Sequence, residues 1–247
     1  MLEFEDFTWR RKREQAIQHA IASGDAYVAP SAVRAIFCEV AASDLEHRGF
    51  RFFRDRHFLR EIDPDIIQIF GLGRIGALQY GLECGVSLAF VPHDWKRRIA
   101  WHRTEKAARL DLFRYPFNDD RIAEDLRDRM RIDAFEGVAR LRFNMARSWQ
   151  AQGPELLSWL EETRTLEQIA QRAREQCDNL PAIAGHWPPP QMVQAFCLAR
   201  TGRVAEGRVL LKSVIAAHYI GLDPAENLLA AYEKVALASP AGAHSAD

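Results

Sequence analysis

The sequence lacks the features that mark several large classes of protein. Its four cysteines are scattered over 247 residues and form no C-x-x-C pair, so neither a disulfide framework nor a zinc site of familiar spacing is expected. The formal net charge is −1, which provides no overall basic field for nucleic acid or an anionic membrane. No apolar run approaches the roughly 18–20 residues that a membrane-spanning helix requires. A globular protein is expected, with neither a membrane nor nucleic acid as its partner.

The first fourteen residues, MLEFEDFTWRRKRE, carry charges where a signal peptide needs an apolar segment. This pattern and the scattered cysteines predict a cytoplasmic, reduced protein. Arginine outnumbers lysine and alanine is abundant, a composition typical of a GC-rich bacterial coding sequence.

Hydrophobic periodicity predicts helices first, then strands, then helices again. A helix is predicted after Pro30. Strands are then predicted at 50–62, 65–72 and 81–92, with an edge strand within 109–117. Segregated elements of this kind indicate an α+β protein with a small antiparallel sheet packed with helices, followed by a helical C-terminal array. The predicted domains are an α+β domain at 1–118, a helical subdomain at 119–238 and a disordered tail at 239–247.

The predicted helical half contains several start and stop signals. A bend is expected near residues 132–133, and Pro154 is expected to open a new helix. Thr165 and Gln168 have the spacing of a capping box. Paired helices are predicted at 191–201 and 204–219, and a last helix from Pro224 to about Ala238.

Residues 66–76, IIQIFGLGRIG, contain the G-x-G-x-x-G pattern of a dinucleotide-binding turn at Gly71, Gly73 and Gly76. The pattern resembles the turn of 2-hydroxy-acid dehydrogenases, and Asp94 lies at about the distance of a ribose-binding acid. The following segment is too short for a crossover helix, and strict alternation already begins at Leu82. We therefore predict an antiparallel hairpin in which these glycines serve flexible turns and bulges, with no bound cofactor.

The stretch GFRFFRDRHFLREIDPDIIQIFGLG…YGLECGVSLAFVP, after an amphipathic helix, resembles the bacterial domain-of-unknown-function family 4304 over about residues 31–117. Members of that family share the order of helix, basic and aromatic strands, an IIQI-like strand and a longer strand that ends in proline. Some members look like components of toxin–immunity loci, so the resemblance implies a protein-binding role. The family has no established catalytic residues, and the long helical C-terminal half departs from its pattern.

Two groups of residues have the types found in metal sites. Asp65 after Pro64, with Glu83 on the next strand, is similar to the metal-dependent nucleases, but Gly85 stands where their lysine is expected. The spacing of His93, Asp94 and His102 matches no familiar ligand pattern. An enzyme that uses Asp65, Glu83 and the Arg74 loop on a phosphate ligand, nucleotide or nucleic acid remains the alternative prediction.

The leading prediction is a non-catalytic cytoplasmic protein that binds another protein, as an immunity-like or accessory factor. The segment MVQAFCLARTGRVAEGRVLLKSVI resembles the helical hairpin of tetratricopeptide repeats, although no second copy occurs at a fixed period. Cationic and aromatic side chains on two predicted loops are the expected partner contacts. They are Arg74, Trp95, Arg97 and Arg98.

Overall fold

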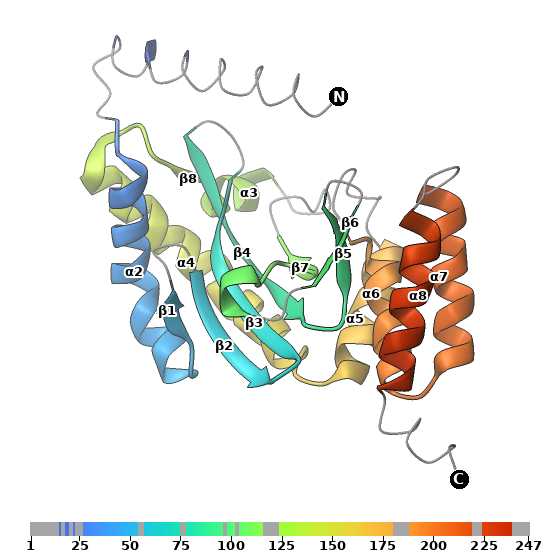
Figure 1. Cartoon of the computed structure of the whole chain (residues 1–247). Helices are drawn as coiled ribbons and strands as arrows, with labels where there is room; N and C mark the ends of the chain where they lie inside the picture. The colour runs from blue at the N-terminus through green and yellow to red at the C-terminus, as the bar shows by residue number, and fades with distance from the viewer. Residues whose placement is uncertain are drawn as a thin grey trace. The chain divides into compact units, whose positions relative to one another are not determined.

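The computed structural model describes residues 15, 18–19, 22, 27–53, 57–74, 78–95, 98–101, 104–115, 124–179, 188–218 and 224–238. A helix at residues 30–47 precedes the strands, most strands lie between residues 51 and 114, and further helices follow residue 136, which confirms the predicted α+β class (Figure 1). The strands are β1 Arg51–Phe53, β2 His57–Asp63, β3 Ile66–Arg74, β4 Gln79–Leu88, β5 Pro92–Trp95, β6 Arg98–Trp101, β7 Leu112–Arg114 and β8 Ile132–Asp133. The helices are α2 Pro30–His47, the 3₁₀ turn η1 Glu105–Ala107, α3 Glu124–Met130, α4 Gly137–Glu161, α5 Leu166–Asn179, α6 Pro190–Arg200, α7 Val204–His218 and α8 Pro224–Leu237.

The main sheet has the strand order β1-β2-β3-β4-β7, and β8 also pairs with β4, whereas β5 and β6 form a separate two-stranded sheet. The chain forms two compact units. Unit 1 comprises Met1–Arg60, Phe70–Cys84 and Arg114–Ser158, and unit 2 comprises Glu61–Ile69, Gly85–Phe113 and Trp159–Asp247. Both are discontinuous in sequence, whereas the predicted domains follow one another along the chain, because β2, β3, β4, β7 and α4 are each divided between the two units. The predicted tail at 239–247 lies outside the described residues.

The strands on either side of GLGRIG form a hairpin, as predicted. β3 and β4 are hydrogen-bonded neighbours, and only residues 75–78 separate them, too few for the crossover that a parallel pair requires. The predicted turn begins too early, because Gly73 lies inside β3. Gly71 also lies in β3, within the strand predicted at 65–72, and Gly76 lies outside the described residues. A glycine inside a strand often marks the close approach of another group, and this is the case for Gly73.

The strand predicted at 81–92 is too long at its C-terminal end. β4 stops at Leu88, whose backbone N–H donates to the carboxylate of the buried Asp111 over 2.7 Å, so this N–H is not available to a neighbouring strand. Pro92, expected to close the strand, instead begins β5, which pairs antiparallel with β6. The predicted bend at residues 132–133 is also wrong, because they form β8 and pair with Gln79 and Tyr80.

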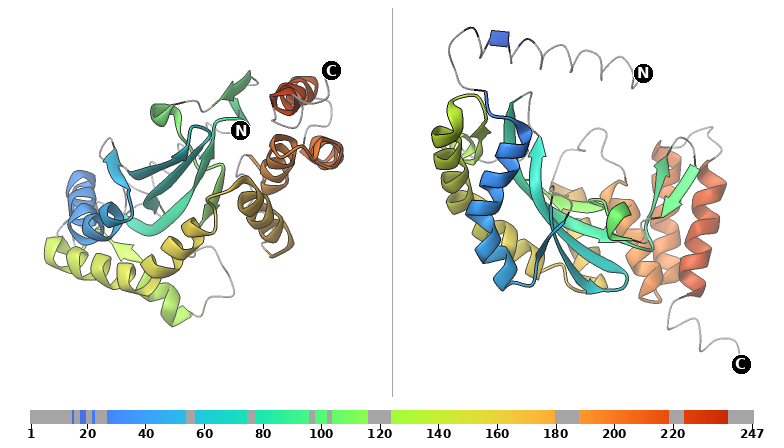
Figure 2. Two further views of the ribbon diagram at one scale, coloured as in Figure 1. Left: turned by 90° about the horizontal axis from the view of Figure 1, so that it is seen from below. Right: turned by 60° about the vertical axis from the view of Figure 1, so that its left-hand side comes forward.

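In unit 1, α2 and the first part of α4 cover one face of the sheet (Figure 2). The ring of Phe37 on α2 lies 5.7 Å from the ring of Phe58 and 6.3 Å from that of Phe70. Trp149 of α4 packs edge-on against Phe70 at 5.4 Å, and its indole N–H donates to Asp44 of α2 over 3.0 Å. Aromatic contacts therefore join two helices and two strands that are distant in sequence.

Helix α4 is continuous over 25 residues and contains Pro154, so the prediction that Pro154 opens a new helix is wrong. A proline inside a helix leaves the carbonyl four residues earlier without its partner. That carbonyl belongs to Gln150, which is exposed to water. The predicted capping box of α5 is confirmed: the amide N–H of Thr165 donates to Gln168 over 3.0 Å, and the amide N–H of Gln168 donates back over 3.3 Å.

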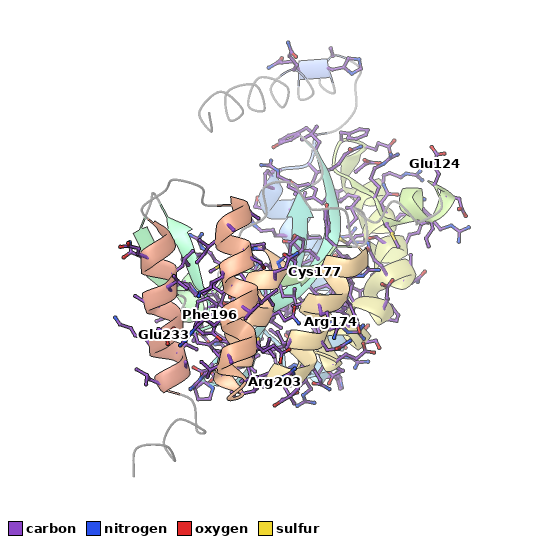
Figure 3. All side chains as sticks on the ribbon, turned by 90° about the vertical axis from the view of Figure 1, so that its right-hand side faces the viewer. Glu124, Arg174, Cys177, Phe196, Arg203 and Glu233 are labelled. Atoms are coloured by element: carbon purple, nitrogen blue, oxygen red, sulfur yellow. The ribbon has the colours of Figure 1, made fainter. Side chains whose placement is uncertain are left out.

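The paired helices predicted after residue 190 are α6 and α7, and the turn between them includes Gly202 with φ of 84°. Helix α6 contacts α5, α7 and α8, and both of its faces are buried. Phe196 of α6 meets Tyr232 of α8 edge-on at 5.5 Å. Figure 3 shows these helices with Phe196 labelled between α7 and α8. Helix α6 is therefore the core of a bundle.

Candidate functional site

Gly73, the second glycine of GLGRIG, lies against the side chain of Glu83 on the neighbouring strand. A Cβ atom at position 73 would lie 2.4 Å from Oε2 of Glu83 and 3.1 Å from a ring carbon of Tyr115. Separations this short are repulsive, so the absence of a side chain at Gly73 makes room for the carboxyl group. Glu83 is consequently enclosed by β3 on one side and by the Tyr115 ring, directly after β7, on another.

This enclosure changes the proton affinity of the carboxyl group. Burial raises the pKa of Glu83 from its ordinary value of 4.5 to about 7, because water no longer solvates the charged form. The pKa of Tyr115 is also raised, first by burial and second by the negative charge of Glu83. Near neutral pH, Glu83 therefore exchanges between its acid and its carboxylate, a property that acid–base groups require.

Asp65 and Glu83 have different local surroundings. Asp65 belongs to unit 2, where its carboxylate forms an ion pair with Arg200, and Glu83 belongs to unit 1. Among the described residues, no three His, Cys, Asp or Glu side chains are close enough to hold a metal ion. The alternative enzyme, which would use Asp65 and Glu83, therefore stays a prediction.

The four predicted contact residues come from two hairpins. Arg74 is exposed at the end of β3. Trp95 ends β5 and Arg98 begins β6, opposite each other in the register, but their side chains lie outside the part of the chain that the structure describes. Arg97 lies wholly outside it. The structure thus places Trp95 and Arg98 at the tip of the β5–β6 hairpin and Arg74 at the end of a different strand.

Unit 2 contains a cleft of about 350 Å³ beside this hairpin. The strands β5 and β6 pack against α8, as Figure 2 also shows. Turns at the ends of β2 and β4, the end of β6 and the last turns of α6 and α8 surround the cleft. Its lining residues are Pro64, Asp65, Ala89, Phe90, Trp101, Arg200, Lys234, Val235 and Ala238. We call this feature the Arg200 cleft.

Arg200 is held in place on several sides. Its guanidinium group donates to the Asp65 carboxylate and to the backbone carbonyl of Ala238, and it lies 5.9 Å from the centre of the Phe90 ring. A planar cation that donates two hydrogen bonds and lies near an aromatic ring loses much of its side-chain freedom, so it is oriented before a ligand arrives.

Sequence reasoning singled out Asp65 but missed Arg200, Trp101 and Lys234. Asp65 and Arg200 are 135 positions apart, so no local spacing connects them. The apolar pattern of α6 ends at Arg200. This is the one local signal in the sequence that places Arg200 at a helix terminus. The cleft exists only because the turn before β3 lies beside the ends of α6 and α8 in unit 2.

No family model matches the chain, and no curated protein or solved structure is significantly similar to it. The resemblance to family 4304 therefore stays a prediction. Within the described residues, no helix combines the length and the apolar character needed to cross a membrane.

Proposed function

We propose that this protein is a non-catalytic factor that binds another protein, in an immunity-like or accessory role, and that the Arg200 cleft receives part of that partner. The observation that carries the proposal is the composition of the cleft. Arginine and tryptophan are the residue types enriched at the energetic centres of protein interfaces, and here Arg200 and Trp101 line one small concave site. The resemblance to family 4304 favours the same class of function.

The size of the cleft also favours a protein partner. Its volume of about 350 Å³ lies at the small end of the range for ligand sites. The volume equals the liquid share of about a dozen water molecules, at about 30 Å³ each. A single large amino-acid residue fits in this volume, whereas a dinucleotide cofactor is several times larger. The cleft therefore suits one anchoring residue of a larger partner.

The proposal is tested by capturing partners from the source cell on the immobilised full-length chain. The expected result is one protein that elutes at fixed stoichiometry and re-forms the complex when both components are purified. Lys234 lines the cleft and is exposed, so Lys234→Glu should leave the fold intact and weaken the complex about tenfold or more. Lys212 is exposed on α7 and does not line the cleft, so Lys212→Glu is the matched control.

Arg74→Glu tests the contact predicted from the sequence in the same assay. A complex weakened by Arg74→Glu and unaffected by Lys234→Glu would move the interface to the β3–β4 hairpin. Recovery of no stoichiometric partner, combined with turnover of a nucleotide or nucleic acid that is lost in Glu83→Gln, would replace the proposed function with the enzyme.

A further inference from the structure

The Arg200 cleft combines an apolar wall with cations. Phe90 and Trp101 contribute aromatic rings, and Pro64, Ala89 and Val235 add aliphatic surface. Phe90 is 6% exposed and therefore fixed by its surroundings, whereas Trp101 is only partly buried and also lines the cleft. A ligand of this wall has an apolar or aromatic part, because burial of such a part releases water from both surfaces.

The cleft has more positive than negative side chains, and they differ in whether they form ion pairs. Arg200 and Lys234 contribute two positive charges and Asp65 one negative charge, which leaves the lining at +1. Asp65 and Arg200 pair with each other. Lys234 is exposed, and in the described part of the chain its ammonium group forms neither an ion pair nor a side-chain hydrogen bond. The uncompensated charge therefore belongs to Lys234, which favours an anion.

We propose that the Arg200 cleft binds the carboxyl-terminal residue of the partner chain, with its free α-carboxylate at Lys234 and a large apolar side chain against Trp101. The inference rests on the proposed function, because the occupant is part of a partner protein. A free α-carboxylate and an apolar side chain occur together in one residue only at a chain terminus. An interior residue has no free α-carboxylate, and its side chain is either apolar or, in Asp and Glu, a carboxylate. The cleft has room for one large residue.

The chemistry is tested on the full-length protein with two small probes. N-acetyl-L-phenylalanine carries the carboxylate and the ring, and N-acetyl-L-phenylalaninamide carries the same ring without the charge. Isothermal titration calorimetry is expected to show that the acid binds at least ten times more tightly than the amide. Lys234→Gln should lower the affinity for the acid to that for the amide, and Lys212→Gln should leave the ratio unchanged. The indole N–H resonance of Trp101, assigned with Trp101→Phe, should shift on addition of either probe.

Two results would overturn the inference. Equal affinities for the acid and the amide would show that the cleft does not select a carboxylate, and an undiminished preference in Lys234→Gln would show that another group selects it. The partner assay separates this failure from failure of the proposed function. A complex that persists in saturating N-acetyl-L-phenylalanine and after amidation of the partner's C-terminus overturns the inference and leaves protein binding intact. Normal probe binding with no partner captured overturns the proposed function instead.

Discussion

Replacing Glu83 with glutamine should remove a pH-dependent loss of stability. The two side chains have nearly the same shape, so Glu83→Gln keeps the packing against Gly73 and Tyr115 while it abolishes the ionisation. In the folded protein burial holds the pKa of Glu83 at about 7, compared with its ordinary value of 4.5. Below pH 4.5 both the folded and the unfolded chain bind this proton, and the acid form contributes its full stability.

The sign and size of the effect follow from proton linkage. Between pH 4.5 and 7 the unfolded chain loses the proton while the folded chain retains it, so the free energy of unfolding falls as pH rises. Each pH unit costs about 1.4 kcal/mol, so the loss from Glu83 is complete above pH 7 at about 3 kcal/mol. For a chain of 247 residues this corresponds to a Tm difference of about 6–12 °C.

The measurement is thermal or urea unfolding of the wild type and Glu83→Gln at half-unit steps from pH 4.5 to 8. The two proteins should be similar at pH 4.5, and the variant should be the more stable by about 3 kcal/mol at pH 8. Glu61 is exposed on β2, so Glu61→Gln is a control that changes one charge without changing a buried site. Its stability curve should run close to that of the wild type.

The reasoning is refuted if the curves of the wild type and Glu83→Gln run parallel over this pH range. Such a result would mean that the carboxyl group turns towards water and ionises with its ordinary pKa. An NMR titration of the Glu83 side-chain carboxyl resonance would decide this directly, since a midpoint near pH 4.5 contradicts the enclosure by β3 and Tyr115.

Three further substitutions test the packing. Gly73→Ala places a Cβ 2.4 Å from the Glu83 carboxyl, so it should push that group towards water, and its stability should depend less on pH than that of the wild type. Gly207→Ala places a Cβ 2.4 Å from the Tyr232 hydroxyl and 2.6 Å from a backbone oxygen of α6, and it should cost about 1–3 kcal/mol in urea unfolding. An unchanged urea midpoint would show that α7 shifts without cost. Gln68→Leu removes the donor to the backbone carbonyls of Leu160, near the end of α4, and Thr163, just after it, and loss of about 1–3 kcal/mol is expected in the same assay.

Local sequence signals determined many of the elements of this protein. The alternation after Leu82 predicted β4, and the short connection that follows GLGRIG predicted a hairpin, because a crossover does not fit in so few residues. The Thr165–Gln168 spacing predicted the start of α5, since a capping box needs only residues three positions apart. Each of these features depends on groups that are close together in the chain.

Features that depend on distant groups were decided by the tertiary structure. At the end of β4 the Leu88 N–H donates to the carboxylate of Asp111, 23 positions away, and α4 continues through Pro154, where the local proline signal predicted a start. The G-x-G-x-x-G pattern is visible in the sequence, but the structural role of its glycines is not. Gly73 lacks a side chain because Glu83 and Tyr115 occupy that space, and a glycine in sequence does not reveal which group approaches it.

The same distinction applies to the two candidate sites. From the sequence, Asp65 and Glu83 had the residue types and strand positions of a pair of metal ligands. The folded chain pairs Asp65 with Arg200, 135 positions away, and encloses Glu83 between β3 and Tyr115, so tertiary contacts outweigh local spacing. The sequence by itself determined the types of the elements and the order in which they follow one another. Which charged groups meet, and therefore which of them can bind or titrate, was decided by packing between distant segments.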